Sequence, residues 1–257
     1  MATPVDFDSN DLQTASIITE DVIHENVPNQ EIAFLGLAND NRSVLPFQNY
    51  PSRSIRAIGH LRASTIADLD ALIDTFKSYF NGKDKNLDIG YDGGTRRYIA
   101  TATTVNVNRT RGLAFASFDI VFTCSEPFGR DTATDSALSA TGRTSDNYSD
   151  ALTILGTAPF MLPVITITFN TVTGGDNYLT FTNVANGQGI HIVDQTFVDD
   201  DVLVIDCYNK LVTLNAVEIN FIGAFPEFTA GSFTVNYSDG FTTRNFDIDI
   251  DYYPYYL

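Results

Sequence analysis

The stretch from Arg53 to Gly129 constrains the fold most, because it holds one amphipathic helix pattern in a chain otherwise patterned for strands. Thr65 with Asp68 three residues later is a capping-box variant that indicates a helix start, and Asn81-Gly82 supplies a left-handed stop. Apolar residues between these signals recur at steps of three and four, so they share one helix face. The spacing predicts a helix over residues 65–80 that covers one face of a sheet. The apolar residues are Ile66, Leu69, Leu72, Ile73, Phe76, Tyr79 and Phe80.

A hairpin and a long strand are predicted after this helix. The segment from Leu87 to Tyr91 alternates apolar with small or polar residues, Asp92-Gly93-Gly94 signals a tight turn, and Arg96 begins the return strand. The strand that follows is apolar on both sides, which predicts burial between two layers or against a neighbouring subunit. One side carries Phe118, Ile120, Phe122 and Cys124, and the other carries Leu113, Phe115 and Val121.

Residues 132–150 change character, because Ser, Thr, Asp, Ala and Gly replace nearly all large apolar residues. This composition predicts a linker or mobile loop over 132–157 and a domain boundary there. Beyond it, short strand patterns at roughly ten-residue spacing indicate an antiparallel sandwich. Turn signals separate these strands: Gly174-Gly175-Asp176-Asn177, Asn186-Gly187, Asp199-Asp200-Asp201 and Tyr208-Asn209-Lys210.

The final strand has the clearest alternation, with apolar and acidic residues pointing to opposite faces. Phe246, Ile248, Ile250 and Tyr252 share one face, and Asp247, Asp249 and Asp251 share the other. An aromatic cluster then follows, which predicts docking either onto its own domain or onto a neighbouring subunit; the residues leave both open. The candidate interface residues here are Tyr252, Tyr253, Tyr255 and Tyr256.

Charge and cysteine content exclude several classes of protein. The chain has 15 basic and 32 acidic residues and a formal charge of −17, which opposes binding to nucleic acid or to anionic membranes. No run approaches the ~20 apolar residues of a spanning helix, so no membrane insertion is expected, and no signal peptide pattern opens the sequence. Cys124 and Cys207 fall in different predicted domains, so we expect free, buried thiols.

Catalytic and metal-binding patterns are missing from the sequence. Acidic residues at alternate strand positions lie ~6.6 Å apart, too far to chelate one ion without a turn, so the acidic face of the last strand is expected to be solvated. The histidines His24, His60 and His191 are scattered, and no nucleophile elbow or phosphate-binding glycine loop occurs. We therefore predict no catalytic, cofactor or metal residues and no enzyme activity.

One small cationic cluster, Arg96-Arg97-Tyr98, has an aromatic residue beside it. In a chain of charge −17 such a cluster is expected to meet an acidic partner rather than nucleic acid. If the chain forms a ring, an acidic patch on the next protomer is the natural target, since ring closure requires heterologous contacts. Arg96, Arg97 and Tyr98 are therefore candidate subunit-interface residues.

Several segments resemble siphophage distal tail proteins. RSIRAIGHLRASTIADLDALIDTFKSYF, LDIGYDGGTRRYIATATTVNVNR and FASFDIVFTCSEPFG resemble the family's N-terminal domain. LGTAPFMLPVITITF and VLVIDCYNKLVTLNAVEINFIGAFPEFTAGSFTV resemble its second, galectin-like β-sandwich. One departure is Ala216, where a glycine is expected after the strand that ends at Asn215.

The resemblance implies a mainly β chain in three parts. These are an N-terminal β-sandwich or split-barrel-like ring domain with one helix (1–131), a linker (132–157) and a galectin-like antiparallel sandwich (158–257). The implied function is a structural hub: a hexameric ring at the phage tail tip, with a channel that DNA crosses without specific binding. Its implied partners are the tail tube protein, the tape-measure or tail-associated hub protein, and receptor-binding or fibre proteins.

The resemblance also implies location in the virion and synthesis in the host bacterial cytoplasm. Two alternatives stay open. Galectin-like sandwiches often bind glycans, so the chain could be a carbohydrate-binding, lectin-like module that uses tyrosines in the absence of tryptophan. It could also be another tail-tube or baseplate component built on similar sheets.

Overall fold

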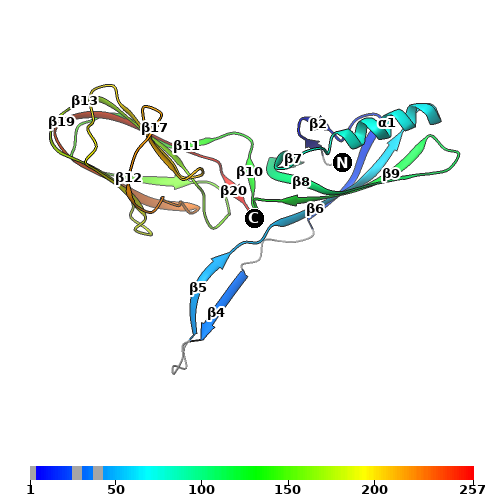
Figure 1. Cartoon of the computed structure of the whole chain (residues 1–257), viewed down its shortest axis with the longest axis horizontal. Helices are drawn as coiled ribbons and strands as arrows, with labels where there is room; N and C mark the ends of the chain where they lie inside the picture. Colours follow the sequence, from blue (N-terminus) through cyan, green and yellow to red (C-terminus); the bar gives the residue numbers. More distant parts are fainter. Residues whose placement is uncertain (1–3, 25–30, 37–42) are drawn as a thin grey trace. The chain divides into compact units, whose positions relative to one another are not determined.

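The computed structural model describes residues 4–24, 31–36 and 43–257 and divides the chain into two compact units, with the division between Thr132 and Ala133 (Figure 1). Both units consist mainly of antiparallel strands, and α1 (Ile66–Ser78) is the helix among the described residues. The predicted fold class, mainly β with one helix, is confirmed.

The N-terminal unit is built on a sheet of order β2-β1-β7-β8-β9-β6-β3, and β10 pairs with β8. The predicted hairpin is the β7–β8 pair, whose two-residue loop lies between Tyr91 and Gly94. Strands β4 and β5 form a separate two-stranded sheet. The bounds are β1 (Val5–Phe7), β2 (Asn10–Asp11), β3 (Ile17–His24), β4 (Glu31–Gly36), β5 (Ser43–Asn49), β6 (Arg53–Arg62), β7 (Lys85–Tyr91), β8 (Gly94–Arg109), β9 (Phe115–Cys124) and β10 (Gly129–Asp131).

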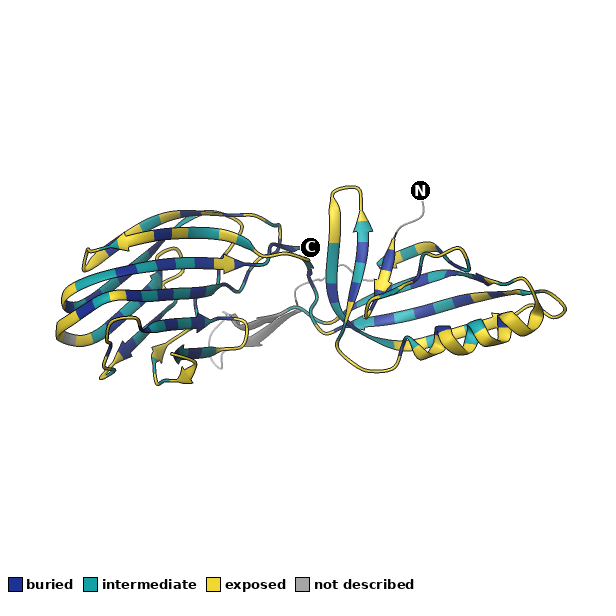
Figure 2. Ribbon diagram, turned by 90° about the horizontal axis from the view of Figure 1, so that it is seen from above, coloured by how far each residue is buried: buried dark blue, intermediate teal, exposed yellow. Residues whose placement is uncertain are grey.

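Helix α1 covers the buried face of this sheet, as the spacing predicts. The Thr65 hydroxyl accepts a hydrogen bond from the Asp68 amide at 3.1 Å, which satisfies one of the free amides at the helix start. Phe76 is fully buried and its ring lies 4.9 Å from that of Phe118 on β9. The opposite face of the helix is exposed (Figure 2). The helix ends at Ser78, two residues before the predicted limit, and Gly82, with a φ of +111°, follows four residues later.

The two sides of the N-terminal sheet approach each other at one end. His24, at the end of the edge strand β3, contacts Tyr91, at the end of β7, through a hydrogen bond of 2.6 Å between Nε2 and the phenol oxygen. A bridge between Gln13 and Ile18 joins the segment after β2 to β3. The sheet is therefore curled toward closure, as a split barrel requires.

The C-terminal unit depends on two long strands, β13 (Val164–Asn183) and β19 (Gly231–Tyr252), which pair along almost their whole length. The first half of β19 pairs with β12, and its second half pairs with β11. The Tyr237 and Phe246 rings, from the two halves, lie 4.3 Å apart at their centroids, so the two halves pack face to face. Both strands therefore bend and belong to both layers of a sandwich.

The remaining strands extend the two layers. Strands β15, β16 and β17 continue the layer that contains the start of β13, and β14 and β18 continue the other. The bounds are β11 (Asp135–Arg143), β12 (Asn147–Ile154), β14 (Gly189–Val193), β15 (Val202–Asp206), β16 (Leu211–Leu214), β17 (Val217–Glu218) and β18 (Ile222–Gly223). The short strand β20 (Tyr255–Tyr256) is not part of either layer.

The turn predicted at Gly174–Asn177 is wrong, because β13 continues through it. Gly174 and Gly175 have φ values of +59° and +82°, which bend the strand without ending it. Gly175 is paired with Phe241 of β19, and a Cβ atom on it would overlap the Gly240 carbonyl oxygen. The two strands thus turn the same corner together, and glycine lets their backbones come close.

The linker predicted over 132–157 is also wrong, because β11 and β12 lie there and both pair with β19. The compact C-terminal unit accordingly begins at Ala133 rather than at residue 158. The segment supplies a few inward side chains to the core, including Tyr148, Leu152 and Ile154, and its other positions are mostly exposed. Such edge positions tolerate the Ser- and Thr-rich composition that suggested a linker.

The alternation in the second half of β19 and the state of the two cysteines agree with the predictions. Phe246, Ile248, Ile250 and Tyr252 are buried, whereas the aspartates between them are half-buried or exposed. Cys124 and Cys207 are free and buried. Burial raises the pKa of each thiol to about 12, so both are neutral at physiological pH.

Ala216 occupies a conformation that favours glycine. Asn215 and Ala216 form the two-residue turn between β16 and β17, with φ values of +51° and +64°. Because alanine is strained in this region, Ala216→Gly should raise the free energy of unfolding by about 0.5–1 kcal/mol. Urea titration followed by circular dichroism measures this. Ala230→Gly, at an exposed position without a positive φ, should instead destabilise slightly; equal effects of both changes would contradict the expectation.

Candidate functional site

The cationic cluster predicted as an interface is engaged within the protomer. Arg97 donates two hydrogen bonds to Asp88, at 2.7 and 2.6 Å, directly across the β7–β8 ladder. Arg96 pairs with Asp131 across the β8–β10 ladder. Tyr98 is 4% exposed. Charge reversal at either arginine would therefore disturb the protomer itself, and a neighbouring subunit would have to compete with these acids. The interface role of the three residues stays a prediction.

The C-terminal tyrosines contact their own unit. The Tyr252 hydroxyl donates to Asp135 at 2.9 Å and accepts a hydrogen bond from the Leu155 amide at 2.8 Å. Burial raises the pKa of this phenol to about 12. The Tyr255 carbonyl accepts bonds from the amides of Thr157 and Ala158. These contacts favour the first of the two alternatives for the tail, docking onto its own domain.

Tyr253 and Tyr256 are half-buried, and their role at an interface stays a prediction.

The outward face of β9 offers a further candidate surface. Leu113, in the turn before this strand, is 56% exposed and Phe115 is 38% exposed, whereas Val121 on the same side is half-buried. Among the described residues, no second layer covers the exposed end of this face, and its contact with a neighbouring subunit stays a prediction.

A cluster at one end of the N-terminal sheet brings together residues that sequence reasoning did not connect. Arg53 opens β6, and its guanidinium carbon lies 5.5 Å from the centre of the Tyr98 ring. His24 lies beside both Tyr91 and Tyr98, with ring centroids 6.0 Å away in each case. Burial, and secondarily the Arg53 charge, lowers the pKa of His24 to about 4. The inward register of β6, at Arg53, Ile55, Ala57 and Leu61, was the available signal that Arg53 is buried.

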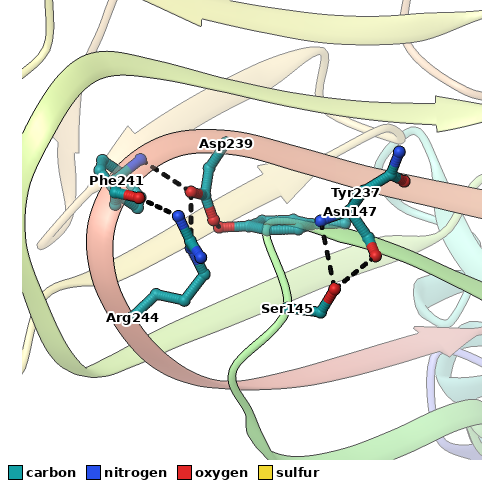
Figure 3. A network of polar contacts seen from close by, with 6 residues as sticks. All are labelled: Ser145, Asn147, Tyr237, Asp239, Phe241 and Arg244. Atoms are coloured by element: carbon teal, nitrogen blue, oxygen red, sulfur yellow. Dashed lines mark hydrogen bonds and ion pairs between the residues drawn. The ribbon is translucent and has the colours of Figure 1, made fainter.

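A second polar cluster lies at the bend of β19 (Figure 3). Asp239 is 4% exposed and accepts hydrogen bonds from the Tyr237 hydroxyl at 2.7 Å and the Phe241 amide at 2.9 Å. Arg244 donates to the same carboxylate through Nε at 2.8 Å and also bonds the Phe241 carbonyl. Burial, followed by the Asp239 charge, raises the pKa of the Tyr237 phenol well above its usual value. The charge pair thus holds the corner of the sandwich closed.

A surface hollow of about 360 Å³ lies between the end of β14 and the segment before β18. It combines one aromatic ring with polar side chains, and its lining residues are Val193, Asp194, Gln195, Asn220, Phe221 and Ile222.

Within the described ranges, no group of three or more His, Cys, Asp or Glu side chains is placed to hold a metal ion. Among all the residues that the structure describes, no helix has the length and the apolar character that crossing a membrane requires.

The chain thus combines a curled, helix-covered sheet with a two-layer sandwich, and a family comparison identifies the second of these parts. Residues 155–256 match the family model described as the siphovirus-type tail component, C-terminal domain. The match covers the C-terminal part of the chain, and the resemblance to distal tail proteins is confirmed.

Among solved structures, the fold is similar to the crystal structure of the Dit protein of phage SPP1, described as a paradigm of the hub adsorption apparatus in phages that infect Gram-positive bacteria. The identity is 14%, the match covers 100% of both chains, and the TM-score is 0.70. Chains of the phage P2 baseplate in its activated conformation are more distant. With calcium the identity is 9%, with 98% of each chain covered and a TM-score of 0.46. With strontium the identity is 9%, 96% of this chain and 97% of the other are covered, and the TM-score is 0.42. No curated protein matches the chain.

Proposed function

We propose that this chain is a distal tail hub protein that assembles into a hexameric ring at the tip of a siphophage tail. The observation that carries the proposal is the match of residues 155–256 to the siphovirus-type tail component family, supported by a fold similar to the SPP1 hub protein over the full length of both chains. In this function the chain acts by assembly, through sheet faces and loops, rather than by converting a substrate.

The ring would join the tail tube protein to the tape-measure or tail-associated hub protein, and would recruit receptor-binding or fibre proteins. The strongly negative charge of −17 suits a wall around DNA, because like charge keeps the polymer from adhering to a channel. DNA would therefore cross the channel without specific binding. The protein would be made in the cytoplasm of the host bacterium and reside in the virion at the tail tip.

Assembly can be tested with the purified full-length chain. Native mass spectrometry should give six copies, and negative-stain microscopy should show a six-fold ring with a central opening. A chain that stays monomeric at every concentration would contradict the hexamer. Retention of a specific sugar on a glycan array by that monomer would favour the lectin-like alternative, for which the hollow beside Phe221 is the candidate site.

A further inference from the structure

Arg53 is a buried cation that has no counter-charge among the residues that the structure describes. It is 6% exposed, and its Nε and Nη1 atoms have no hydrogen-bond partner among the residues that the structure describes. The Tyr98 ring, 5.5 Å away, attracts the charge through its face but accepts no in-plane hydrogen bond from these nitrogens. Buried charges in proteins are normally paired and hydrogen-bonded, so this guanidinium calls for a partner.

Among the described residues, six other arginines have acidic partners, and Arg53 is not among them. Their partners are aspartates, and most of these pairs are more exposed than Arg53. The pairs are Arg56–Asp119, Arg96–Asp131, Arg97–Asp88, Arg109–Asp70, Arg143–Asp150 and Arg244–Asp239. Within the described part of the chain, six arginines are thus paired with carboxylates, and the more deeply buried Arg53 has no such pair.

The groups around Arg53 are neutral at physiological pH. The pKa of His24 is lowered to about 4, chiefly by burial, and that of the Cys124 thiol is raised to about 12 by burial. Burial also raises the pKa of the Tyr91 phenol well above its usual value. The His24 Nδ1 atom, like the arginine nitrogens, is buried without a partner in the described ranges. With respect to the described residues, the cluster thus carries one uncompensated positive charge and a further polar atom without a partner.

The cluster lies at the curled end of the sheet and reaches the surface. Tyr91, which is 43% exposed, hydrogen-bonds His24, and His24 is itself half-buried. We propose that His24, Arg53, Tyr91 and Tyr98 form a carboxylate-binding site, filled by an acidic side chain from a second copy of this chain. This proposal rests on the proposed function, because ring assembly brings the second copy to the site.

Charge favours a second copy as the source of the carboxylate. Each copy carries 32 acidic and 15 basic residues, so acids are the side chains that a neighbour has in excess. Two copies of charge −17 repel each other, and a local contact between a cation and a carboxylate lowers that repulsion where they meet. A guanidinium that is unpaired in the protomer and paired in the assembly would contribute to association without stabilising the free protomer.

We expect the variant Arg53→Met to have a more stable protomer and a weaker self-association than the wild type. Arg53→Met keeps the apolar stem and removes the charge, so it should raise the melting temperature of the dissociated protomer. The same change should weaken self-association at least about tenfold, since a buried charge pair is lost from the interface. Differential scanning fluorimetry at dilution and analytical ultracentrifugation measure the two effects on the full chain.

Arg62→Met is the matched control, because Arg62 lies on the same strand, is exposed, and donates to the Ala15 carbonyl. It should leave self-association unchanged. A lower melting temperature for Arg53→Met would show that the charge is already paired in the protomer and would overturn the site. Unchanged association of Arg53→Met would overturn it as well.

The hypothesis of a ring and the hypothesis of a carboxylate-binding site can be tested separately. If the wild-type chain never associates, the ring and the second copy are both excluded. Sodium acetate can then probe the carboxylate site itself, against sodium chloride of equal ionic strength. A rise in melting temperature with acetate in the wild type, lost in Arg53→Met, would support the site; no specific rise would overturn it.

Discussion

Asp239→Ala should lower the free energy of unfolding of the C-terminal unit by about 3–5 kcal/mol, because it leaves the nearly buried Arg244 without its counter-charge. The change also removes the acceptor of the Tyr237 hydroxyl and of the Phe241 amide, at the bend of β19. Differential scanning calorimetry of the full chain should show the C-terminal transition at a clearly lower temperature, with the N-terminal transition unchanged.

Asp70→Ala is the control for this effect, since Asp70 also pairs with an arginine, Arg109, but both side chains are about half exposed. It should change stability by no more than about 1 kcal/mol. Replacing both partners, as in Asp239→Asn with Arg244→Met, should recover part of the loss, because no unpaired charge then remains. Equal losses in the single and double variants would argue against the charge pair as the cause.

Gly175→Ala should cost at least about 3 kcal/mol, for two reasons that add. The residue has a φ of +82°, which strains an L-residue, and the new methyl group would overlap the Gly240 carbonyl and lie 2.8 Å from the Thr242 amide nitrogen. Both obstacles are backbone atoms, so no side-chain rotation relieves the overlap. Unfolding in urea, followed by circular dichroism, measures the loss.

Gly187→Ala separates the two reasons. Gly187 has a similar φ of +71°, but a methyl group there would meet nothing within 4 Å. It should therefore lose only about 1 kcal/mol, the conformational part. If the two glycines proved equally tolerant of alanine, the close approach of β13 and β19 at the corner would not be a determinant of stability.

Local patterns in the sequence were sufficient for several elements. The helix is fixed by its apolar repeat and by the Thr65 cap, and the β7–β8 hairpin by the Asp92-Gly93 turn; both depend on residues close together in the chain. The alternation in the last strand likewise identified its buried face, from Phe246 to Tyr252. Where neighbouring residues decide the structure, periodicity and turn chemistry predict it.

Elements that depend on distant partners were missed. Strands β11 and β12 have little apolar pattern of their own and exist because β19, about a hundred residues later, pairs with both. Gly174 and Gly175 predict a turn from the sequence alone, because a bend within a long strand and the end of a strand have the same residue pattern. In each case tertiary pairing overrides the local signal.

The charged residues show the same limit. Arg96 pairs with Asp131 and Arg244 with Asp239, but only the second pair is close in sequence. The pattern of −17 overall charge suggested acidic partners outside the protomer, whereas the fold supplies them inside it. A single arginine at the start of a strand usually points to solvent, but the alternation in β6 places Arg53 on the buried side, with Ile55 and Ala57.

The position of β19 has a consequence for synthesis on the ribosome. This strand pairs with β11, β12 and β13, and its residue Asp251 lies opposite Val164, 87 positions earlier (251 − 164). The sandwich therefore cannot complete either layer until β19 has left the exit tunnel, whereas the path of strands from β2 to β3 in the N-terminal sheet is complete in sequence by Cys124. Nascent chains should thus carry a folded first domain while the strands of the second remain unpaired until β19 has been synthesised.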